Sequence, residues 1–210
     1  RFANPADFTF IFVVNIDPNN KETQQLLAIY LGGLKTYNKN TEKFDKVYRE
    51  FPKGKVNNYF TFKMKTKKAS NRIYYTADIP FNINNQVAVS AIGDILDIRY
   101  LESIREKEGG SYGVGVYGGM ANVPKDQASI LMQFDTDPEK QAKLMGIIHD
   151  EIKQIIDNGP LKDDLDKVKE NLMKQYKQDI EQNNWWRGKL KAYYQDGLNY
   201  RTDYKAAVDA

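Results

Sequence analysis

Residues 84–121, NNQVAVSAIGDILDIRYLESIREKEGGSYGVGVYGGMA, decide the fold of this 210-residue chain. The first part carries apolar side chains at helical spacing, which predicts a long helix with one apolar stripe. The stripe consists of Val87, Ala91, Ile95, Ile98 and Leu101. Gly109 and Gly110 end this helix, and the β-branched and aromatic residues after them predict a strand over residues 111–121. The stretch therefore predicts a long helix that leads directly into a strand.

The flanking segments continue the alternation of strands and helices. Residues 56–67 and 72–81 predict an antiparallel strand pair, with Phe60, Phe62 and Met64 on one face of the first strand. Other elements are predicted on the same grounds: a strand over Phe8–Ile16, a helix over about 21–31, a strand over 127–136 paired with 111–121, and helices from Asp137 as N-cap, from Leu161 and around Trp185, Trp186, Leu190 and Tyr193. Antiparallel strands joined by long helices predict an α+β fold, an antiparallel or mixed sheet with long helices packed on one face.

The length and composition indicate one domain over residues 1–210, since 41% of the residues are apolar. Within it we expect a strand–helix element over 1–34, a connector over 35–55, and the main sheet and helices over 56–210. The chain does not begin with Met and opens in sequence typical of a folded domain, so we expect a fragment of a longer protein.

The charge balance and the absence of cysteine exclude several classes of function. The net charge of +3 provides no strong field for nucleic acid or an anionic membrane. Without Cys there are no disulfides, thiolate nucleophiles or thiolate metal sites, and cytosol and periplasm fit equally well. No apolar stretch reaches the roughly 18 residues needed to span a bilayer.

His149 is the only histidine, so this chain alone cannot form a His-based zinc site or a Ser-His-Asp triad. We interpret His149 as a partly exposed structural residue beside the apolar stripe of its helix. Two acidic clusters, 135–137 and 163–166, lie where helix starts favour acidic side chains, and we interpret them as caps rather than cation ligands.

Lysines alternate with aromatic residues between Tyr59 and Lys68. In a strand, alternate side chains point to opposite faces, whereas a nucleic-acid platform needs both kinds on one surface. The pattern therefore disfavours nucleic-acid binding. Six glycines between Gly109 and Gly119 lead from a helix into a strand, the reverse of a phosphate-binding loop. They admit either a peptide backbone at the sheet edge or close helix–sheet packing.

Arg105 precedes Tyr112 by seven residues across the Gly109-Gly110 turn. A reversal of this kind can bring a guanidinium and a phenol together. The guanidinium offers a planar fork of donors, and the phenol can donate to a carbonyl oxygen that is becoming an oxyanion. The alternative is that Arg105 pairs with Glu102 or Glu108.

The stretch from Leu101 to Tyr112, with this Arg-to-Tyr spacing, resembles the arginine–tyrosine segment in the C-terminal half of the pitrilysin/insulinase family of zinc metallopeptidases. Residues 8–18 followed by Tyr30-Leu31-Gly32-Gly33-Leu34 are similar to that family's strand, helix and "YLG-x-L" element, and residues 158–169 to its "GP-x-x-x-E-L-x-x-x-K" helix start. Val14 and Asp164 depart from this pattern, since the family usually has glycine and often glutamate there.

The resemblance implies one half of a mitochondrial-processing-peptidase-like metallohydrolase, in which the other half carries an H-x-x-E-H zinc motif. This chain would bind no zinc and be inactive alone. Arg105 and Tyr112 would hold the peptide and stabilise the scissile carbonyl, while zinc and general base come from another domain or a paired subunit. The expected partners are that zinc-bearing domain and a peptide bound by addition to a sheet edge. The alternative is a non-catalytic scaffold or peptide-binding protein of the same fold.

Overall fold

The computed structural model describes residues 4–37, 50–106 and 111–210, and for residues 105, 106, 111 and 112 it describes the backbone alone. The chain forms two compact units. One comprises residues 1–46 and 177–199, and the other comprises residues 47–176 and 200–210.

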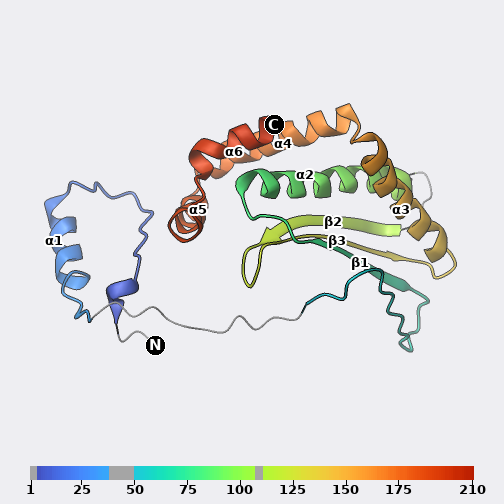
Figure 1. Cartoon of the computed structure of the whole chain (residues 1–210), viewed down its shortest axis with the longest axis horizontal. Helices are drawn as coiled ribbons and strands as arrows, with labels where there is room; N and C mark the ends of the chain where they lie inside the picture. The colour runs from blue at the N-terminus through green and yellow to red at the C-terminus, as the bar shows by residue number, and fades with distance from the viewer. Residues whose placement is uncertain (1–3, 38–49, 107–110) are drawn as a thin grey trace. The chain divides into compact units, whose positions relative to one another are not determined.

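The second unit is built on a three-stranded antiparallel sheet (Figure 1). Its strands are β1 (Ala69–Ala77), β2 (Ser111–Ala121) and β3 (Gln127–Thr136), in the order β1-β3-β2. Ile73 of β1 and Val116 of β2 both pair with Met132 of β3. Because side chains alternate along a strand, this row places three apolar residues on the same face of the sheet.

Helices cover this apolar face. α2 (Ile83–Tyr100) contacts both β2 and α6 (Tyr200–Asp209), and Figure 1 shows it lying between them. α3 (Gln141–Asn158) packs on the same core, and α4 (Lys162–Asp179) lies beside α6, where the rings of Tyr176 and Tyr204 stack. The buried core joins residues of α2, the turn after it, the sheet and α3: Leu96, Tyr100, Ile104, Val116, Met132, Phe134, Leu144 and Ile148. The structure confirms the predicted α+β fold with helices on one face.

The first unit contains α1 (Lys21–Tyr30), α5 (Asn183–Asp196) and a short 3-10 turn over Pro5–Asp7. α1 confirms the helix predicted after residue 20. It begins there because the Asn20 side chain caps it, accepting a hydrogen bond from the Thr23 N–H at 3.0 Å. No residue of α1 is buried.

Two predicted strands are absent from the described structure. Residues 8–16 and 56–67 form no strand, and Phe12 and Phe60 are 58% and 77% exposed. β1 pairs with β3 and not with the preceding segment. Alternation predicts which side chains would share a face, but a strand forms only where another strand supplies its hydrogen bonds, and the sequence pattern does not identify that partner.

Two helix boundaries also differ from the prediction. α3 begins at Gln141 rather than directly after Asp137, whose side chain accepts from the Glu139 N–H at 2.9 Å and closes a turn before the helix. The last helical stretch is divided into α5 and α6, because Gly197 adopts a left-handed φ of +72° that ends α5.

Candidate functional site

The end of α2 and the start of β2 carry the two predicted site residues. α2 runs without a break into a π-helical turn over Leu101–Glu106, which contains Arg105. Tyr112 is the second residue of β2. The side chains of Arg105 and Tyr112, and residues 107–110 between the two elements, lie outside the described part of the structure. The approach of these two side chains and their roles therefore remain predictions.

Two buried side chains hold the π-helical turn against the core. Tyr100 and Ile104 are both 0% exposed. The Tyr100 hydroxyl donates to the carbonyl oxygen of Ile148 on α3 at 3.1 Å and lies 3.6 Å from Sδ of Met132. Burial raises the pKa of Tyr100, so this hydroxyl remains a donor. The backbone next to Arg105 is therefore anchored on a packed element, which suits a site that must hold its geometry.

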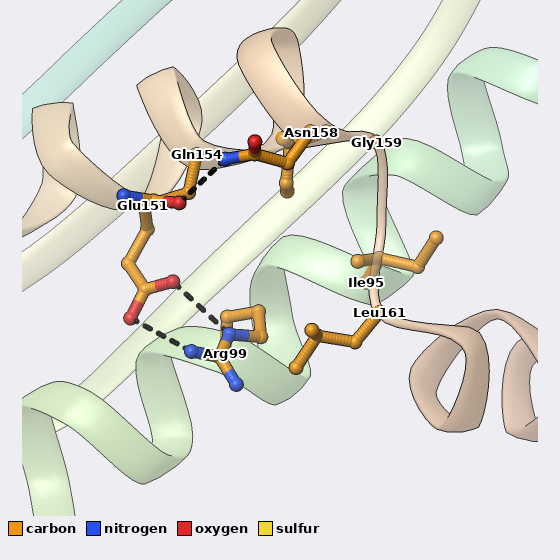
Figure 2. A pocket seen from close by; sticks show the side chains of 8 residues that line it. Ile95, Arg99, Glu151, Gln154, Asn158, Gly159 and Leu161 are labelled. Atoms are coloured by element: carbon orange, nitrogen blue, oxygen red, sulfur yellow. Dashed lines mark hydrogen bonds and ion pairs between the residues drawn. The ribbon is translucent and has the colours of Figure 1, made fainter.

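The side chain of Arg99 connects three helices and the π-helical turn. Its Nε and Nη2 lie 3.0 and 3.3 Å from the two carboxylate oxygens of Glu151 on α3, as Figure 2 shows. Its Nη1 lies 3.3 Å from Oε2 of Glu102 in the turn and 3.9 Å from Oδ2 of Asp164 on α4. The pKa of Arg99 is raised, and the hydrogen bonds to Glu151 are the largest cause, so its charge is permanent. Glu102, one of the two suggested partners of Arg105, thus interacts with Arg99.

A pocket of about 180 Å³ lies beside this cluster, between α2, α3 and the loop into α4 (Figure 2). Its lining consists of Ile95, Arg99, Glu151, Gln154, Ile155, Asn158, Gly159 and Leu161. The two charged side chains of this lining bond to each other, and the Asn158 amide donates to Oε1 of Gln154 at 2.8 Å. The Arg99–Glu151 pair thus joins α2 to α3, and the Asn158–Gln154 bond closes the last turn of α3, so we interpret the pocket as part of the scaffold.

The glycines of β2 and the facing glycine of α2 differ in the space around them. A Cβ on Gly118 would lie 2.1 Å from the carbonyl oxygen of Val89, and a Cβ on Gly93 would lie 2.6 Å from the backbone nitrogen of Gly118. Here glycine permits close contact between helix and strand, one of the two readings of the sequence. Around Gly113 and Gly119, by contrast, nothing lies within 4 Å of an added Cβ. These two positions leave open space beside the strand.

A side chain from α2 occupies part of the β2 edge. The N–H of Val116 donates to Oδ1 of Asp97 at 3.1 Å, although Val116 is paired in register with Met132 of β3. A helix side chain thus takes a hydrogen-bonding position that an added strand would use. Gly113 and Gly119 lie three residues before and three residues after this contact, and both leave open space beside the strand.

His149 lies beside a tyrosine of the sheet. Its Nδ1 lies 3.1 Å from the hydroxyl of Tyr75 on β1. Within residues 4–37, 50–106 and 111–210, no three His, Asp or Glu side chains gather in a group that could hold a metal ion. With one histidine and no cysteine in the sequence, the residues present do not fit a zinc site. No helix in the described ranges is sufficiently long and apolar to cross a membrane.

Comparison with known proteins places these features in a family. Residues 1–172 match the family model of the peptidase M16 inactive domain. The chain is 24% identical over 211 residues to a "Zinc protease PQQL-like" protein of Arabidopsis thaliana, covering 92% of this chain and 21% of that protein. It therefore spans about a fifth of that relative's length.

Solved structures show the same fold. The crystal structure of the periplasmic protease PqqL from Escherichia coli matches with a TM-score of 0.71 at 18% identity, over 90% of this chain and 21% of that one. A peptidase M16 inactive domain from Pseudomonas fluorescens matches with a TM-score of 0.56 at 23% identity, over 68% of this chain and 35% of that one. The family match covers most of the chain and the fold agrees with it: this chain belongs to the peptidase M16 inactive domain family.

Proposed function

We propose that this chain is the substrate-binding, catalytically incomplete domain of a zinc metalloendopeptidase. Arg105 and Tyr112 hold the peptide and stabilise the scissile carbonyl, while a separate domain or subunit supplies zinc and the general base. The family membership carries this proposal, because the matched family is the inactive domain of a peptidase. Relatives about five times longer, one of them named as a zinc protease, leave room for a zinc-bearing partner domain.

The backbone positions of Arg105 and Tyr112 favour this role. Arg105 lies in a π-helical turn, and such turns occur frequently at functional sites. Tyr112 lies at the beginning of a strand whose later residues are held against α2. A site on packed elements holds its groups in place before the substrate binds, so little reorganisation is needed as the carbonyl becomes tetrahedral.

The peptide is proposed to bind as an added strand along the first part of β2. Gly113 leaves open space there, whereas further along Asp97 already accepts from the Val116 N–H. Main-chain hydrogen bonds to such an edge bind peptides of many sequences. This arrangement would leave Arg105 and Tyr112 to act at one peptide bond.

The test replaces Tyr112 by Phe in the complete enzyme. Removing one oxyanion donor lowers kcat by about 10²-fold to 10³-fold, and KM should change little. Arg105→Ala should instead raise KM and lower kcat/KM, since it removes a group that holds the peptide. Unchanged rates in both variants, with unchanged melting temperatures, would remove the two residues from the mechanism.

A non-catalytic scaffold or peptide-binding protein of the same fold is the second candidate, since the matched family is defined by inactivity. The two candidates differ in whether the complete protein contains, or pairs with, an H-x-x-E-H domain. A zinc-dependent peptidase assay on the complete protein and on its complexes separates them. Activity abolished by a chelator and restored by zinc supports the peptidase role.

A further inference from the structure

Arg99 is attached to the π-helical turn through its backbone and its side chain. Its carbonyl oxygen accepts a hydrogen bond from Oγ of Ser103 at 2.8 Å. Its guanidinium contacts Glu102 in the same turn, while the opposite side of the fork bonds to Glu151 on α3. One residue therefore links the turn that carries Arg105 to a neighbouring helix.

The guanidinium of Arg99 also compensates the negative charges around it. Three carboxylates, those of Glu102, Glu151 and Asp164, surround one guanidinium. Asp164 is buried, at 6% exposed, and its other nearby cation is Lys167, with Nζ 3.8 Å from Oδ1. Without Arg99, three negative groups from the turn, α3 and α4 would remain close together and repel one another.

We propose that Arg99 is a positioning residue, which fixes the π-helical turn and so sets the location of Arg105 relative to the bound peptide. This inference rests on the proposed function, because it assigns to Arg99 the placement of a substrate-holding group. The guanidinium is suited to the task, since its planar fork bonds both oxygens of Glu151 while a third nitrogen still reaches Glu102. A lysine side chain has a single nitrogen and would not reproduce the contacts that three separate guanidinium nitrogens make.

The test is a double-mutant cycle on peptide hydrolysis by the complete enzyme. Arg99→Met should lower kcat/KM by about tenfold or more, because displacement of a substrate-holding group by about 1 Å costs up to about 10²-fold. Arg99→Lys should recover only part of this loss. If Arg99 acts through Arg105, then Arg99→Met combined with Arg105→Ala should be no slower than Arg105→Ala alone. Losses that multiply in the double variant would overturn the inference.

Two further variants keep this test decisive. Glu102→Gln retains Arg99 and its bonds to Glu151 but weakens the link to the turn, so it should show a smaller loss of kcat/KM even if Arg99→Met fails to fold. Lys153→Met, which removes an exposed ion pair with Asp157 on α3, is the matched control and should leave kcat/KM unchanged. A normal rate in Glu102→Gln would refute the positioning role. If Arg105→Ala itself has no effect, then Arg105 does not hold the peptide; that result counts against the role given to Arg105 in the proposed function and is distinct from a failure of the Arg99 inference.

Discussion

Oδ2 of Asp164 lies 3.9 Å from Nη1 of Arg99, inside the protein and without a hydrogen bond. A charge-assisted hydrogen bond between these groups needs about 2.8 Å. The carboxylate is thus near enough for electrostatic attraction and about one methylene group short of contact. The resemblance described above has glutamate at this position, and its side chain is longer by one methylene group.

Asp164→Glu should therefore stabilise the domain. The longer side chain can bring its carboxylate to the guanidinium and satisfy a buried oxygen, worth about 1 kcal/mol of unfolding free energy. Thermal unfolding of the two proteins measures the difference. Asp166→Glu is the control. Asp166 lies two residues after Asp164 on α4 but is exposed, so this change should leave the melting temperature unchanged. A lower stability of Asp164→Glu would show that the site has no room for the added group.

Gly118→Ala should destabilise the fold severely. The added methyl group would meet the carbonyl oxygen of Val89 at 2.1 Å, and backbone atoms of a packed helix move only at high cost. We expect a loss of about 3 kcal/mol or more of unfolding free energy. Gly119→Ala, the neighbouring position with open space, should change the stability by less than about 0.5 kcal/mol. Equal effects in a denaturant titration would contradict the close packing of α2 on β2.

Asp97→Ala should expose the N–H of Val116 at the β2 edge. This variant removes the carboxylate oxygen that accepts from that N–H, so we expect the Val116 amide to exchange with solvent faster in hydrogen-exchange NMR. Asp97→Asn retains a side-chain oxygen and should exchange at a rate close to that of the unmodified chain. If all three proteins exchange alike, Asp97 does not cover the edge.

Asp94→Asn should have an effect that depends on pH. Partial burial, and secondarily the negative charge of Asp97, raise the pKa of Asp94. A carboxyl with a raised pKa binds its proton more tightly in the folded state, so the stability falls as pH rises from the ordinary Asp value of about 3.9 through the raised value. The substitution removes this loss. The melting temperature of Asp94→Asn should therefore exceed that of the unmodified chain at pH 7 and match it at pH 3.

The elements around the site were largely predictable, because helical and strand periods are local properties of the chain. The apolar stripe from Val87 to Leu101 predicted α2, and residues 111–121 and 127–136 predicted β2 and β3 almost residue for residue. The strands predicted over residues 8–16 and 56–67 did not form, because a strand depends on a partner that the local pattern does not specify. Arg99 was missed, since its significance comes from carboxylates far away in the sequence.

By itself, the sequence determined which kinds of metal site this chain lacks the side chains for and which family it resembles. One histidine and no cysteine exclude a His-based or thiolate zinc site within this chain alone, and the Arg105-to-Tyr112 spacing was visible as a linear motif. Only the tertiary structure revealed that Arg99 joins α2 to Glu151 and Asp164, that Gly118 permits helix contact, and that Asp97 covers the edge at Val116. The physical reason is that composition and residue spacing are properties of the linear chain, whereas ion pairs and close packing depend on which distant residues folding brings together.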